Sequence, residues 1–353
     1  MTDFGSKIFD DAFVSIIILN YNGGHHLMEC IESLFRSVIC KNEIILIDNN
    51  SSDNSHIICK EKFPEIILIQ NKENIGMGAR NIGLKKAKGN FIVFLDSDTV
   101  VENNWLISLM NSYQQNGEGL YQPKLLEKKR PQVISSGGNM INIFGLAYII
   151  GRGEQDVGKY DKFSHISYTS GACTFSSSET IKKIGFVDDI FFAYHDDVDY
   201  GWRALLLGIQ SYYEPTSIVF HYGSPTLEWS SKKYFLLERN RLICLLTLYS
   251  RKTFLKILPF LIVVEIGVFF FFSTKGLAIT KLKSYLALIK MRRSILKKRK
   301  EIEKTRKIQD KIVIKNFVDD FRLPLIATPE HSVRVFNSII PILSKQARKI
   351  ITL

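Results

Sequence analysis

Short apolar runs rich in isoleucine and valine recur along the first third of the chain, and segments with helical spacing separate them. The runs are Val14–Leu19, Glu43–Ile47, Glu65–Ile69 and Phe91–Leu95, and helical spacing is found in His26–Ser37 and Asp53–Phe63. Near-continuous apolar runs are typical of strands buried on both faces, and their alternation with helices is typical of parallel sheets. The pattern predicts an α/β fold with a mostly parallel central sheet, whose ligands gather at the carboxyl ends of the strands.

The pattern changes near Leu120. From there to His221 the strand candidates are shorter, Gly-rich turns separate them, and one helix is expected from about Asp197 to Leu207. After Pro225 the spacing is helical. We therefore expect an α/β domain at 1–225 with halves at about 13–119 and 120–225, a helical region associated with a membrane at 226–309, and a tail at 310–353 without a readable role.

The helical region contains a strongly apolar run, Ile257–Phe272, which Pro259 and Glu265 interrupt. A membrane-spanning helix needs about 20 apolar residues, so this run is short for a span. Downstream, apolar residues at helical spacing alternate with Lys and Arg and predict a basic amphipathic helix lying in a membrane interface; they are Leu282, Tyr285, Leu286, Ile289 and Leu296. The alternative is a buried core helix followed by a solvated charged one.

The net charge of +12 is concentrated in this region, because Lys275–Lys307 holds thirteen Lys or Arg against Glu301 and Glu303. Such a segment favours an anionic surface. Since the basic run directly follows an apolar stretch, anionic lipid is a better match than nucleic acid, which we do not expect as a partner.

The compartment is suggested by the first residues and by the cysteines. Met1–Phe13 contains acids and no continuous apolar run, so no secretory signal is expected. The five cysteines form no C-x-x-C pair, which is typical of reduced, buried thiols. We expect the protein at the cytoplasmic face of the cell membrane, bound peripherally or through one short membrane helix.

Two carboxylates, Asp96 and Asp98, follow the apolar run Phe91–Leu95. In an extended backbone residues i and i+2 face the same side, and two like charges so placed repel each other unless a cation lies between them. Mg²⁺ and Mn²⁺ prefer oxygen ligands, including those of phosphates. The pair predicts a site for a divalent metal with a diphosphate; the alternative is that both acids cap the following helix.

Four motifs occur in the order found in one known family. They are Val14–Asn22, Ile47–Asp53, Asn74–Gly83 and Leu95–Asp98, and a fifth element, Phe191–Arg203, follows in the second half. With these motifs, Val14–Gly223 resembles the family 2 glycosyltransferases, particularly the rhamnosyltransferase-like branch. The resemblance implies the GT-A nucleotide-sugar fold, with the nucleotide bound by the first half and the acceptor by the second.

The resemblance also implies which residues meet the donor. Asn20, Tyr21 and Asp48 would border the base and ribose, and Asn50 is a further candidate for contact with the nucleotide sugar. Asn74, Gly76, Arg80 and Asn81 would lie beside the phosphates, and Asp96 would contact the nucleotide sugar as well as the metal. Glycines allow close backbone approach, a helix start directs N–H groups at anions, and arginine adds a positive charge. Without the resemblance, Gly76 and Gly78 could form an ordinary turn.

In the second half the resemblance points to acids at the start of a helix. An inverting transfer needs a carboxylate that takes the acceptor proton, and we expect Asp197 to be this base, with Asp196 as the alternative because it replaces the usual Glu. Clustered acids should raise at least one pKa. Asp199, Trp202 and Arg203 are candidates for contact with acceptor or diphosphate, although Arg203 could equally form a structural ion pair. His221 matches a possible third metal ligand beside Asp96 and Asp98.

Together these features predict an inverting, metal-dependent glycosyltransferase that moves a sugar from a nucleotide-diphosphate donor to a glycan or lipid-linked acceptor. A nucleotidyltransferase that makes a sugar nucleotide is one alternative, but the loop after the first strand, Asn20–His26, lacks the Lys or Arg expected there. A non-catalytic membrane-anchored binding module is the other, and it gives no reason for the acids at 96, 98, 196, 197 and 199.

Overall fold

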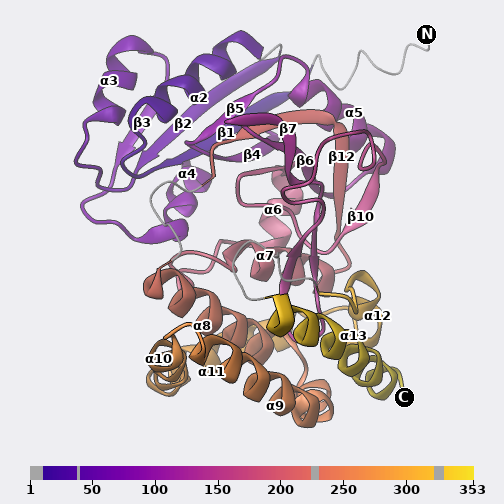
Figure 1. Ribbon diagram of the computed structural model, residues 1–353. Coiled ribbons are helices and arrows are strands. Elements are labelled where there is room, and N and C mark those ends of the chain that lie inside the picture. Colours follow the sequence, from indigo (N-terminus) through magenta and orange to yellow (C-terminus); the bar gives the residue numbers. More distant parts are fainter. Residues whose placement is uncertain (1–10, 38–39, 224–229, 322–329) are drawn as a thin grey trace.

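The computed structural model describes residues 11–37, 40–223, 230–321 and 330–353. An α/β part lies above a group of C-terminal helices in Figure 1. Most of the segment Met1–Phe13, on which the expectation of no secretory signal rests, and the boundary near Pro225 lie outside the described residues.

The first half contains the predicted parallel strands. They are β1 (Phe13–Asn20), β2 (Lys41–Asp48), β3 (Ile67–Gln70) and β4 (Phe91–Asp96), and they pair in the order β4-β1-β2-β3. The intervening helices are α2 (Gly24–Ser37), α3 (Ser55–Lys62) and α4 (Arg80–Lys86), with a 3₁₀ turn η1 (Gly76–Ala79) before α4. The strands predicted from apolar runs are thus confirmed to within two residues at each end.

Both faces of this sheet are covered. Ile16 and Ile18 pack in a core with α2, α3 and α5 (Trp105–Asn116), whereas Ile17, on the opposite face, packs with α4, α6 (Ser178–Ile184) and α7 (Asp196–Leu206). Burial on both sides explains why the strand sequences are continuously apolar instead of alternating.

The second half makes the sheet mixed. Its strands are β5 (Thr99–Val101), β6 (Gly119–Glu127), β7 (Arg130–Ser136), β10 (Ser164–Ile166), β11 (Cys173–Ser177) and β12 (Gln210–His221). β11 lies between β4 and β6 and is antiparallel to both. The strands of the first half are parallel as expected, and so are β6 and β12, whereas the other described pairs of the second half are antiparallel. β8 (Asn139–Ile141) and β9 (Ala147–Ile149) form a separate small sheet.

The C-terminal helices share a core with the α/β part. They are α8 (Ser231–Leu248), α9 (Arg251–Ser273), α10 (Ala278–Lys290), α11 (Arg292–Thr305), α12 (Asp310–Val313) and α13 (Glu330–Thr352). Trp202 and Leu206 of α7 are buried in one cluster with residues of α8, α9, α11 and α13. The single amphipathic helix expected at 282–296 is divided at Met291 into α10 and α11. The predicted tail, 310–353, includes α13, which packs along α9 in Figure 1.

Candidate active site

The predicted metal ligands meet at one edge of the sheet. Asp96 is the last residue of β4, Asp98 lies in the turn that follows, and His221 ends β12. The pairing of β5 with β12 places His221 opposite Thr99, so the turn and the strand end lie together. One ligand atom from each of Asp96, Asp98 and His221 lies within 4.8 Å of the others, and His221 Nε2 is 3.3 Å from Asp98 Oδ1.

The charges of these three side chains depend on one another. Burial and the neighbouring His221 act in opposite directions on Asp98, and the imidazole prevails, so the pKa of Asp98 is lowered. Burial raises the pKa of Asp96 to about 6, against the opposing charge of Arg80. Two carboxylates and an imidazole that converge in a partly buried position form a donor set suited to a divalent cation, which would compensate the repulsion between the acids. The residues present therefore fit a metal.

Arg80 connects this group to the start of α7. Its Nη2 donates to Asp96 Oδ1 at 2.6 Å and to the carbonyl oxygen of Gly171 at 2.7 Å. The Gly171 N–H in turn donates to Asp197 Oδ2 at 3.4 Å. The acids of the two halves thus converge on one region, as the sequence analysis required, although Arg80 is buried against Asp96 and is not a free cation.

Two neighbouring acids at the start of α7 have raised pKa values. Burial and then the charge of Asp197 raise the pKa of Asp196 to about 7, and burial also raises that of Asp197. Asp196 is only 6% exposed, whereas Asp197 is partly exposed. The greater exposure of Asp197 favours it as the carboxylate that meets a substrate.

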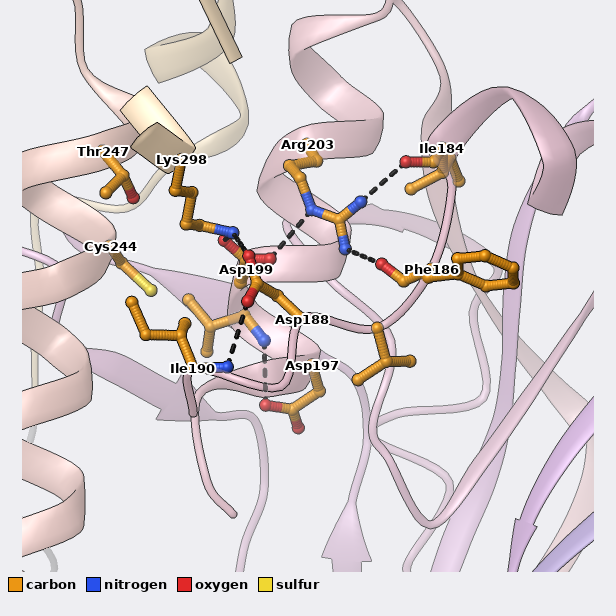
Figure 2. Close-up of polar contacts among 12 residues, drawn as sticks. Ile184, Phe186, Asp188, Ile190, Asp197, Asp199, Arg203, Cys244, Thr247 and Lys298 are labelled. Atoms are coloured by element: carbon orange, nitrogen blue, oxygen red, sulfur yellow. Dashed lines mark hydrogen bonds and ion pairs between the residues drawn. The ribbon is translucent and has the colours of Figure 1, made fainter. Parts of the chain in front are cut away.

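The other three candidates on α7 have partners within the protein, and Figure 2 shows two of them, Asp199 and Arg203, bound to each other. Arg203 Nε donates to Asp199 Oδ2 at 2.8 Å, and its Nη atoms donate to the carbonyl oxygens of Ile184 and Phe186. Lys298 Nζ of α11 lies 2.9 Å from Asp199 Oδ1. The rings of Tyr249 and Phe317 enclose Trp202. The expectation that Asp199, Trp202 and Arg203 meet acceptor or diphosphate is corrected: Trp202 is a core residue and the ion pair anchors α7.

On the nucleotide side, Asp48 is turned inward. It is 2% exposed, accepts a hydrogen bond from Asn20 Nδ2 at 2.9 Å, and lies 3.3 Å from His56 Nδ1. Asn20 and Asp48 therefore hold the loop after β2, while Tyr21 and Asn50 are exposed at its rim. Of these four candidates for contact with the nucleotide, only Tyr21 and Asn50 are exposed to solvent.

The glycine loop before α4 contacts the second half of the chain. Gly76 has φ +70, and a Cβ there would lie 2.0 Å from the carbonyl oxygen of Phe192; at Gly78 it would lie 1.9 Å from Asp189 Oδ1. Asn81 is paired with the backbone of Val187 through both its amide atoms. The two glycines thus allow another segment of the chain to approach closely, where the sequence analysis expected a ligand. Asn81 connects the first half to the second through its hydrogen bonds with Val187.

Comparisons with known proteins agree with this geometry. The family model described as Glycosyl transferase family 2 matches residues 15–184. That segment, slightly less than half of the chain, is similar to the family 2 glycosyltransferases. The chain also superposes on GalNAc-T7, solved with UDP, GalNAc and Mn²⁺, with a TM-score of 0.57 and 18% identity over 71% of this chain and 51% of the other. The fold is that of GT-A glycosyltransferases.

Three curated relatives are similar to parts of this chain. Glycosyltransferase GlyG of Streptococcus pneumoniae is 34% identical over 29% of this chain and 35% of its own. The minor teichoic acid biosynthesis protein GgaB of Bacillus subtilis is 39% identical over 31% and 13%. The Escherichia coli UDP-Glc:alpha-D-GlcNAc-diphosphoundecaprenol beta-1,3-glucosyltransferase WfgD is 39% identical over 26% and 37%. The matches thus cover little more than a third of each relative at most.

The loop before α7 has an unusual backbone. Phe192, Tyr194 and His195 all have φ between 61° and 65° without being glycine. Each such residue costs about 1–3 kcal/mol unless its surroundings enforce it. Here Asn240 Nδ2 of α8 lies 2.7–3.0 Å from the carbonyl oxygens of Phe191, Ala193 and Tyr194. Asn240 is therefore a positioning residue for the acids that follow.

We expect Asn240→Asp to loosen this loop, because the new carboxylate has the same shape but repels the three carbonyl oxygens. Leaving buried polar groups unpaired should lower the free energy of unfolding by about 1–3 kcal/mol. Denaturant unfolding measures the stability, and kcat should fall while the KM for the donor changes little. Asn116→Asp at the exposed end of α5 is the control, and equal effects of the two changes would contradict a special role for Asn240.

Sequence reasoning missed two residues that organise the site. Asn49 donates to Asn74 Oδ1 at 2.8 Å and accepts from the Ile75 N–H at 3.1 Å, so it fixes the glycine loop. Its place directly after Asp48 in a recognised motif was a usable signal. Asn240 had no such signal, because it lies on a helix beyond the matched domain.

Proposed function

We propose that the protein is an inverting, metal-dependent glycosyltransferase that moves a sugar from a nucleotide-diphosphate donor to a hydroxyl of a glycan or lipid-linked acceptor. The observation that supports it most is the link from Asp96 through Arg80 and Gly171 to Asp197. This link supports the proposal that one site contains both the residues that would bind the diphosphate and the carboxylate that would act as base.

In the proposed reaction the acceptor oxygen attacks the anomeric carbon while the bond from that carbon to the diphosphate oxygen breaks. Attack from the face opposite the leaving group inverts the anomeric configuration. Asp197 takes the acceptor proton, and Asp196, with its pKa near 7, is the alternative base. Arg80 offsets part of the negative charge at Asp96.

Asp96, Asp98 and His221 would hold the divalent metal, Mg²⁺ or Mn²⁺. When bound, such a cation stabilises the negative charge that develops on a departing diphosphate. The Mn²⁺ and UDP of GalNAc-T7 support this assignment by similarity of fold.

The relatives indicate the class of acceptor. WfgD is named for an acceptor linked to diphosphoundecaprenol and GgaB for teichoic acid biosynthesis. By this likeness we propose an acceptor that is lipid-linked or a surface polymer, reached at the cytoplasmic face of the membrane. Membership of the rhamnosyltransferase-like branch remains a prediction.

The reaction is tested by incubating the protein with UDP-, GDP- and dTDP-sugars and Mn²⁺ or Mg²⁺. We expect one donor to release free nucleoside diphosphate, and the release to stop when EDTA removes the metal, because the diphosphate then loses its counter-charge. Release of pyrophosphate would instead identify a nucleotidyltransferase, and no turnover of any donor would indicate a binding module.

A further inference from the structure

Helix α9 is apolar on two opposite sides. Ile257, Leu261 and Val264 are at most 4% exposed and pack into the helical core. On the other side Ile262, Val263, Ile266 and Phe270 are each between 51% and 65% exposed. Within the described chain, α9 is the one helix long and apolar enough to cross a membrane. Its outward side has no covering element among those residues.

Buried ion pairs keep α9 attached to the rest of the protein. Glu265 points inward and forms ion pairs with Arg241 of α8 and Lys281 of α10, and Tyr285 Oη donates to it at 2.7 Å. Lys281 is fully buried. Breaking such pairs leaves charges without partners in an apolar core, which is strongly unfavourable. α9 therefore remains packed against α8 and α10 and does not cross a bilayer alone.

Helix α10 also has an exposed apolar side. Ile279, Leu282, Leu286 and Ile289 recur at helical spacing, and each is between 50% and 68% exposed. Between the two helices lies an apolar groove of about 360 Å³ lined by residues that include Ile262, Phe269 and Tyr285. These outward residues of α9 and α10, four from each helix, are called the apolar face below. Exposed apolar side chains in such number mark an interaction site.

A basic edge adjoins the apolar face. On α10 and α11 the exposed cations include Lys283, Lys290, Arg293, Lys297, Lys300 and Lys304. An apolar side bordered by lysine and arginine is typical of helices that lie in a membrane interface and attract anionic headgroups. Nucleic acid would match the cations but not the apolar residues, and a second copy would bring the same positive charge against itself.

We propose that the apolar face inserts shallowly into an anionic lipid bilayer, with α9 and α10 lying along the surface and the basic edge on the headgroups. This inference rests on the proposed function in one respect: the lipid-linked acceptor that would be reached at the membrane is itself part of that proposal. The inward side of α11 supports this arrangement, because Lys298 pairs with Asp188 at 2.6 Å and with Asp199 at 2.9 Å (Figure 2). Helix α11, which carries part of the basic edge, thus also holds α7, which bears Asp197.

The test is co-sedimentation of the full chain with phosphatidylcholine vesicles, with and without phosphatidylglycerol, in the absence of any sugar donor. We expect binding to the anionic vesicles that weakens with salt. Changing Ile262, Ile266 and Leu286 together to Glu should weaken it at least about tenfold, because charges replace the inserted residues. Changing Lys297, Lys300 and Lys304 to Gln should remove the preference for phosphatidylglycerol.

The matched control is Val157→Glu, since Val157 is an apolar residue 79% exposed in the α/β part. Circular dichroism shows whether each variant is folded. Release of nucleoside diphosphate, measured without membranes, tests the proposed reaction separately from membrane binding. Wild-type protein that binds neither vesicle, or a triple Glu variant that binds as well as wild type, would overturn the proposal. The proposal would also be overturned if the wild-type protein were a dimer and the triple Glu variant a monomer, because the apolar face would then join two copies of the chain.

Discussion

Sugar transfer is expected to fall by about 10²–10⁴-fold when Asp197 is replaced by asparagine, while donor binding stays nearly intact. General-base catalysis contributes about this factor. The amide has the shape of the carboxylate and can keep the Gly171 contact, but it cannot take the acceptor proton. The measurement is kcat at saturating donor and acceptor, together with calorimetric binding of the nucleoside diphosphate.

Asp196→Asn distinguishes the two candidate bases. Because Asp196 is buried and Asp197 partly exposed, we expect the smaller loss at 196. A large loss for Asp196→Asn with near-normal turnover for Asp197→Asn would transfer the assignment to Asp196. Near-normal turnover in both variants would show that neither acid is the base.

Asp98→Ala is expected to weaken metal-dependent donor binding itself. It removes one of three convergent ligands and leaves His221 without its carboxylate partner. Even the loss of a residue that only orients a metal ligand costs about 10–100-fold in metal affinity, so the loss of a ligand should cost at least this. Calorimetric titration with Mn²⁺, and donor binding with and without EDTA, measure the effect.

Glu102→Ala is the control for this change, since Glu102 is an exposed carboxylate just beyond the same turn. If Asp98→Ala bound Mn²⁺ as tightly as wild type and the Glu102 variant, the metal would have to lie elsewhere. Donor binding that EDTA does not change, in wild type as well, would show that nucleotide recognition at this site is independent of metal.

The sequence was most informative where a residue's place on a strand decides its position. Asp96 and Asp98 follow a buried strand, and the end of β12 delivers His221 to the same edge. Parallel strands align their carboxyl ends, so the place of Asp96 and Asp98 at this edge could be predicted from strand order and burial, whereas His221 was expected there only through the family resemblance. The mixed second half could not, because nothing in the short strands fixes their direction.

Helix geometry explains the wrong assignments on α7. Successive residues of an α-helix are rotated by about 100°, so residues two apart point to nearly opposite sides. Asp197 faces the site, and Asp199 therefore faces Arg203 and Lys298. Reading the acids as one cluster in sequence overlooked this rotation. Gly76 and Gly78 show a second limit of prediction from sequence. The sequence indicates that something approaches these glycines closely, but not whether it is a ligand or another segment of the chain.

The left-handed turn before α7 limits which segments can be exchanged between related proteins. The carbonyl oxygens of that turn are held by Asn240 and Arg239, both of which lie beyond the end of the matched domain at residue 184. A fragment that stops after the sheet would keep every acid of the site but not the support that orients them. Exchanging C-terminal regions between relatives to change their specificity should therefore fail unless the exchanged segment brings an equivalent of α8.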